Sequence, residues 1–137
     1  ILDLLTGDFD GDGRSEIVVS SIVYFGSEAL YELTVYTDLG LGYEESGRYR
    51  FPFGFQTVRV ADLDADGHLD LVGPAVGSGD LMLVRGSASG EFAEPEFFFV
   101  GSGFSELYIV DLDDDSLDDV LGVSSVRGAF RLFNHSL

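Results

Sequence analysis

The chain has 137 residues and a formal net charge of −18 at pH 7, with 25 Asp and Glu residues against 7 Arg residues and no Lys. Nucleic acids and anionic membranes are recognised by clustered basic side chains, and no apolar run approaches the roughly 20 residues of a membrane span, so we expect neither nucleic acid binding nor membrane insertion. A hydrophobic content of 45% argues against a disordered acidic tail, and the absence of Cys excludes disulfides and thiolate metal sites.

Short runs rich in Val, Ile, Leu and aromatic residues, bounded by Gly, follow one another along the chain and predict β-strands. In chain order, these runs are 16–25, 30–37, 43–51, 55–61, 69–76, 79–86, 91–100, 105–110, 118–126 and 128–137. Apolar residues alternate only loosely in 33–36 and 81–84, which predicts that some strands are buried on both faces. No stretch has the pattern and caps of an amphipathic helix, so we expect an all-β fold.

An acidic motif recurs three times between these predicted strands. It reads "DFDGDGRSEIVV" from Asp8, "DLDADGHLDLV" from Asp62 and "DLDDDSLDDVL" from Asp111, with starts 54 and 49 residues apart. Each period contains one strand before the motif, one after it and two more in an up-and-down order. Four-stranded units repeated at about forty to fifty residues are typical of β-propeller blades.

The predicted fold is therefore a β-propeller segment of about three four-stranded antiparallel blades, the last lacking its final strand. We expect residues 1–137 to form one segment, with blades at approximately 1–50, 51–100 and 101–137. Because propeller rings usually have about four to eight blades, we expect further blades from the same longer chain or from other copies of it. Unpaired blade faces would favour such association.

Acids occupy positions 1, 3, 5 and 9 of all three motifs, counted from the first Asp. A tight turn would direct alternate carboxylates inward, and the backbone carbonyl of position 7 would add a fifth oxygen. The predicted metal ligands are Asp8, Asp10, Asp12, Arg14 and Glu16; Asp62, Asp64, Asp66, His68 and Asp70; and Asp111, Asp113, Asp115, Leu117 and Asp119. Six to eight oxygen ligands suit Ca²⁺, whereas Mg²⁺ prefers a smaller octahedron, so we predict calcium.

An EF-hand begins similarly, but it needs flanking helices and a Glu at position 12. Here that position holds Val19, Gly73 and Gly122. Residues 53–75, "FGFQTVRVADLDADGHLDLVGPA", instead resemble the FG-GAP repeat of integrin α-subunit propellers and its bacterial VCBS relatives. In that family, Phe-Gly precedes a strand and a D-x-D-x-D-G-x-x-D-L loop binds calcium. A Gly-Ala-Pro-like turn follows in the family, and here its order is permuted.

The resemblance extends over essentially the whole chain, because residues 78–95 are similar to the later strands of the family. It implies that the acids named above are calcium ligands. Two positions depart from the family pattern. Glu16 replaces the usual Asp, and Ser116 replaces the Gly of the tight turn, where a left-handed backbone is favoured by Gly.

The resemblance implies an extracellular or cell-surface module for adhesion or for binding a protein or carbohydrate ligand, with calcium stabilising the blade loops. The alternative is a purely structural propeller scaffold within a larger assembly or a multidomain enzyme. Aromatic residues at the end opposite the acidic loops are candidate ligand contacts, although such residues usually pack between blades: Tyr24, Phe25, Phe53, Phe55 and Phe104. Since the acids fall in ligand register and no nucleophile cluster is evident, we expect no enzyme activity.

Overall fold

The computed structural model describes residues 2–100, 104–124 and 128–132, which form β-strands joined by turns and loops. The strands are β1 (Asp3–Gly7), β2 (Glu16–Phe25), β3 (Glu28–Asp38), β4 (Tyr43–Phe51), β5 (Arg59–Ala61), β6 (Asp70–Pro74), β7 (Leu81–Val84), β8 (Glu96–Phe98), β9 (Phe104–Val110), β10 (Asp119–Ser124) and β11 (Gly128–Leu132). Within these ranges, no helix is long and apolar enough to span a membrane.

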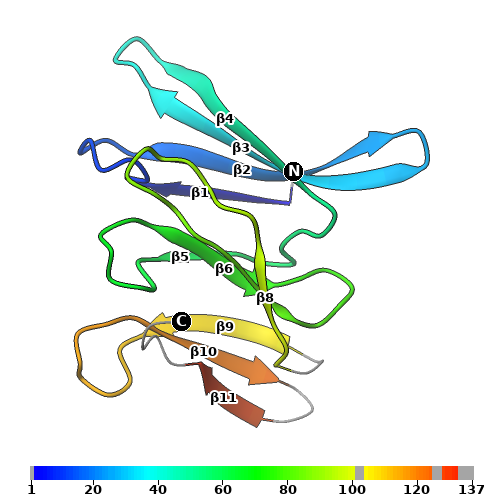
Figure 1. The fold of residues 1–137 in the computed structure, drawn as a ribbon, viewed down its shortest axis with the longest axis vertical. Coiled ribbons are helices and arrows are strands. Elements are labelled where there is room, and N and C mark those ends of the chain that lie inside the picture. The colour runs from blue at the N-terminus through cyan, green and yellow to red at the C-terminus, as the bar shows by residue number, and fades with distance from the viewer. Residues whose placement is uncertain (1, 101–103, 125–127, 133–137) are drawn as a thin grey trace.

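Three antiparallel sheets follow one another along the chain. Their strand orders are β1-β2-β3-β4, β5-β6-β7-β8 and β9-β10-β11, so each sheet is an up-and-down meander. Figure 1 shows the sheets stacked as successive layers, as blades are in a propeller. The prediction of an all-β propeller segment, with two four-stranded sheets and a third sheet of three strands, is confirmed.

The hydrophobic core lies between the sheets, in two clusters that share the second sheet. Leu71 and Val84, which are paired across β6 and β7, belong to the cluster against the first sheet. The next pair, Val72 and Leu83, belongs to the cluster against the third sheet. Successive side chains of a strand point to opposite faces, so β6 and β7 are buried on both sides. The loose alternation of 81–84 is thereby explained.

Several strands are shorter or longer than the sequence predicts. The predicted strand 91–100 is reduced to β8, because Pro95 has no backbone N–H and Ala93 N instead donates to Arg85 O at 2.9 Å. The predicted strand 30–37 lengthens to β3 (Glu28–Asp38), because Gly26 adopts a φ of +64° and a two-residue turn then joins β2 to β3. Residues 125–126 and 133–137 of the last two predicted strands lie outside the described residues.

The three acidic loops lie along one edge of the stack, where each joins the first strand of a sheet to the second (Figure 1). The loop between β7 and β8 also extends to this edge. It runs from the second sheet back beside the first sheet before it returns to β8 (Figure 1). The edge therefore combines the predicted metal loops with the β7–β8 segment, of which residues 91–95 were predicted to belong to a strand.

Candidate metal sites in the acidic loops

The three acidic loops share one backbone conformation. Positions 4 and 6 of every loop have positive φ angles: Gly11 (73°) and Gly13 (88°), Ala65 (57°) and Gly67 (88°), and Asp114 (60°) and Ser116 (71°). Left-handed backbone is unfavourable for residues with a Cβ, so the loop must be held by other interactions wherever Gly is absent. Ser116 adopts the conformation that its place in the motif requires.

Carboxylates within the loop supply those interactions. The backbone N–H of position 6 donates to the Asp at position 1, at 3.0 Å in the first loop and 2.9 Å in the other two. The N–H of position 7 donates to the Asp at position 5, at 2.8, 2.9 and 2.9 Å in chain order. Each loop is thus wound around its own aspartates, which accounts for their repeated spacing.

The acid at position 9 connects the two ends of each loop. Glu16, Asp70 and Asp119 are buried and accept a hydrogen bond from the backbone N–H of position 2, at 2.8, 3.1 and 2.9 Å respectively. Charge-assisted hydrogen bonds of this kind are stronger than neutral ones. Position 9 is therefore a structural tie in all three loops, in addition to its predicted role as a ligand.

Three carboxylates converge in each loop, with ligand atoms within 4.8 Å of one another. The groups are Asp8, Asp10 and Glu16; Asp62, Asp64 and Asp66; and Asp111, Asp113 and Asp115. Of the predicted acidic ligands, Asp12, Asp70 and Asp119 lie outside these groups. Arg14, His68 and Leu117, predicted to offer carbonyls, are positioned by the N–H bonds to position 5.

The first loop contains buried carboxylate oxygens without a partner. Glu16 is 1% exposed, and its Oε1 accepts no hydrogen bond within the described residues, nor does Asp8 Oδ1. Burial raises the pKa of Glu16 above its ordinary value, and the charges of Asp10 and Asp12 raise it further, against hydrogen bonding from the backbone N–H groups of Phe9 and Asp10. Unpaired buried anionic oxygens are costly, so this donor set fits a cation.

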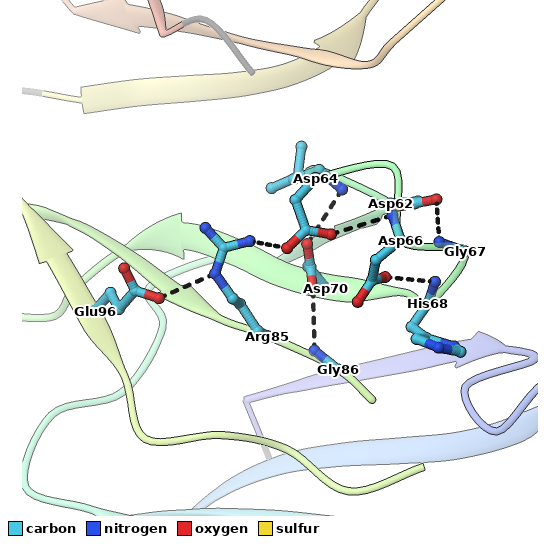
Figure 2. Close-up of polar contacts among 10 residues, drawn as sticks. Asp62, Asp64, Asp66, Gly67, His68, Asp70, Arg85, Gly86 and Glu96 are labelled. Atoms are coloured by element: carbon cyan, nitrogen blue, oxygen red, sulfur yellow. Dashed lines mark hydrogen bonds and ion pairs between the residues drawn. The ribbon is translucent and has the colours of Figure 1, made fainter. Parts of the chain in front are cut away.

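The second loop is contacted by a cationic group from the end of β7. The Arg85 guanidinium contacts Asp64 through Nη1 and Glu96 through Nε, the latter at 3.0 Å (Figure 2). Burial opposes the charged form of Arg85, but the bond to Glu96 and the charge of Asp64 outweigh it, so the pKa of Arg85 is raised. A fixed positive charge therefore compensates part of the acidic cluster.

Asp70 is also satisfied in the second loop. Its Oδ2 accepts from Leu63 N at 3.1 Å and its Oδ1 from Gly86 N at 2.9 Å (Figure 2). Burial raises the pKa of Asp70, although both backbone bonds favour the carboxylate. Asp70 thus connects the acidic loop to the end of β7.

Sequence reasoning missed Arg85 and the segment around Gly90. Arg85 follows Val84, whose partner across β6 and β7 is Leu71, so one further step of the antiparallel register places Arg85 opposite Asp70. That signal becomes visible only when the strand pairing is known. Gly90 lies against Asp10, since a Cβ on Gly90 would be 2.9 Å from Asp10 Cβ, and no local pattern indicates this contact.

The aromatic residues at the opposite end divide into two groups. Tyr24 is 72% exposed and lies with Phe25 near the β2–β3 turn, where the Arg50 guanidinium lies 5.3 Å from the Phe25 ring. Phe53 is exposed, whereas Phe55 is only 2% exposed and packs in the core. The side chain of Phe104 lies outside the described residues.

The family model described as an FG-GAP-like repeat matches residues 8–73. These residues include the first two acidic loops, β2 to β5, and β6 except its last residue, Pro74. This part of the chain is therefore an FG-GAP-like repeat, and the resemblance inferred from the sequence is confirmed there. No significant match was found among curated proteins or among solved structures.

Proposed function

We propose that the chain is a calcium-binding FG-GAP-type module in which ions at the acidic loops stabilise a β-propeller segment. The main support is the pair of buried oxygens without partners in the first loop, Asp8 Oδ1 and Glu16 Oε1. They belong to two of the three residues, Asp8, Asp10 and Glu16, whose ligand atoms converge within 4.8 Å of one another. Carboxylate oxygens are hard ligands, which favours Ca²⁺ over softer transition metals.

Electrostatics connects binding to stability. Carboxylates at such short separations repel one another, which destabilises the calcium-free fold. A bound divalent cation converts this repulsion into attraction and stabilises the folded state alone. In the first loop the residues that would hold the ion are Asp8, Asp10 and Glu16.

Calcium titration of the intact chain tests this proposal. If the dissociation constant lies near 10⁻⁴ M, each site should add about 1.4 kcal/mol at about 1 mM free calcium. We expect chelator to lower Tm, calcium to restore it, and magnesium at equal concentration to have a smaller effect. Asp10→Asn should remove one ion per chain by elemental analysis. An identical Tm in chelator and in calcium would contradict the proposal.

For the wider role, we propose an extracellular or cell-surface module that binds a protein or carbohydrate ligand. This is supported by the FG-GAP-like repeat and by exposed aromatic side chains, including Tyr24, at the β2–β3 turn. Protein and carbohydrate arrays, probed with the wild type and Tyr24→Ala, test it. Binding that is lost in the variant supports this role, and no binding to either array contradicts it.

The alternative role is a structural scaffold within a larger assembly or a multidomain enzyme. It is favoured by the second sheet, whose β6 and β7 are buried on both faces by neighbouring sheets. In either role we propose no catalysis by these loops. Their carboxylates accept hydrogen bonds from the loop backbone and converge on one another as candidate metal ligands. Contacts made solely with sister blades would favour the scaffold.

A further inference from the structure

A small cavity adjoins the first acidic loop on the side of the second sheet. Its volume is about 190 Å³, and it extends between the first sheet and the segment that joins β7 to β8. The lining includes Asp10 and Glu16 from the first loop, Thr37 and Ser46 from β3 and β4, and Ser89 and Glu91 from the β7–β8 segment. Three acidic side chains and three Ser or Thr side chains thus line one space.

The β7–β8 segment is fixed where it covers this space. Gly90 N donates to Ser87 O at 2.8 Å, and Ser87 Oγ donates to Glu91 O at 3.0 Å, which closes a tight turn. Gly90 has a φ of +71° and lies so close to Asp10 that a Cβ would be only 2.9 Å from Asp10 Cβ. Glycine is thus required here both by its backbone angle and by the approach to the acidic loop.

An aromatic anchor holds the segment to the first sheet. Phe92 is buried, and its ring makes edge contacts with Phe9 and Tyr49, both at 5.5 Å between centroids. Such edge contacts between rings stabilise packing beyond the burial of apolar area. The anchor brings Glu91 to the cavity, and Ser89 Oγ donates to Glu91 Oε2 at 3.2 Å, which orients the carboxylate.

The cavity also borders a polar group that lacks a partner. Glu16 lines it, is 1% exposed, and has one oxygen without a hydrogen bond within the described residues. A space of this size holds several water molecules, whose share of liquid volume is about 30 Å³ each. It therefore suits a cation that retains water, and Glu91 lines the same space as Glu16.

We propose that the cation site of the first loop is shared between two blades. Glu91, oriented by Ser89, completes the site from the β7–β8 segment. A divalent cation bound there therefore also holds this segment against the first sheet. This inference rests on the calcium binding proposed above. Side chains that surround a metal site without touching the metal commonly matter for binding. Replacing one of them typically lowers the affinity for the metal by 10–100-fold. The site would couple ion occupancy to contact between blades, which a site made by one loop would not.

The test uses the full chain with the other two loops weakened. Asp66→Asn and Asp115→Asn each keep the Oδ1 that accepts the loop N–H, so both loops retain their fold while losing a charge. In this background, Glu91→Gln should lower calcium affinity about tenfold. Glu94→Gln is the matched control, because Glu94 is an exposed acid of the same segment that does not line the cavity.

Amide hydrogen exchange supplies a second readout that does not depend on affinity. Calcium should slow exchange at Gly90 and Ala93, whose N–H groups bond to Ser87 O and Arg85 O, and Glu91→Gln should weaken that protection. Equal affinities for Glu91→Gln and Glu94→Gln, or calcium protection unchanged by Glu91→Gln, would overturn the shared site. No calcium binding by the wild type would instead overturn the proposed function. Calcium binding by the wild type but not by the background protein would overturn the shared site alone, so the two failures are distinguishable.

Discussion

The first and second acidic loops have the same backbone frame but balance their charge differently. In the first loop, two buried oxygens, Asp8 Oδ1 and Glu16 Oε1, have no partner within the described residues. In the second loop, Asp64 contacts Arg85, and both oxygens of Asp70 accept backbone N–H groups. The motif therefore determines the loop conformation, whereas neighbouring strands determine how much negative charge is left for an external cation.

The difference at position 9 has a simple geometric origin. Glu16 has one methylene more than Asp70, so its carboxylate can accept from the loop N–H and still belong to the converging group. Asp70 makes the equivalent bond but lies outside the group of its own loop, where Asp66 takes part instead. The departure from the family pattern at Glu16 thus changes which carboxylates of the loop converge: position 9 takes part in the first loop, and position 5 in the second.

The largest expected effect is that of Asp70→Asn. An amide can accept only one of the two N–H groups, from Leu63 and Gly86, so the other is left facing an NH₂ group. A buried donor without an acceptor costs about 1–3 kcal/mol, and we expect about 2 kcal/mol of lost stability. Urea unfolding in chelator and in calcium should give similar losses, because the role is structural.

Asp66→Asn is the control for that measurement, because its Oδ1 can still accept from His68 N–H. In chelator it should change stability by less than about 0.5 kcal/mol. A loss for Asp70→Asn that appears only in calcium would show that Asp70 acts mainly through the ion. The two loops would then be alike at position 9.

Arg85→Gln should have the next largest effect. Its guanidinium competes with a metal for Asp64, so removing it should strengthen calcium binding at the second loop about tenfold, equivalent to about 1.4 kcal/mol. In chelator, the same change should lower Tm, because the repulsion among Asp62, Asp64 and Asp66 loses its compensation. Isothermal titration and thermal unfolding measure the two effects.

Arg59→Gln removes the same charge from the second sheet, but the described contacts of Arg59 are with Thr57 and Val58 rather than with the acidic loop. It should leave the affinity within about twofold. Weaker calcium binding by Arg85→Gln would mean that Arg85 supports the loop rather than competing for it. The contrast between the two loops would then need another cause.

Much of this arrangement is local and can be predicted from the sequence. The apolar runs predict the strands, and the spacing of acids predicts loops wound around Asp62 and its counterparts, because these bonds join residues within a few positions. The contacts of Arg85 with Asp64, and of Gly90 with Asp10, join residues 21 and 80 positions apart. They depend on strand register and on the path of the β7–β8 segment, which no local pattern specifies.

The smallest expected effect, that of Glu16→Gln, should change sign with calcium. Because burial raises the pKa of Glu16, its ionisation destabilises the calcium-free fold, and this cost appears as the pH rises above the ordinary carboxyl range. The Gln amide oxygen can still accept from Phe9 N–H, so in chelator at pH 7 the variant should gain about 3 °C in Tm, and less at pH 4. In calcium it should lose a similar amount, because an anionic ligand is gone. Thermal unfolding at both pH values checks this, and a loss of Tm in chelator would show that the Glu16 charge is compensated within the protein, as Arg85 compensates Asp64.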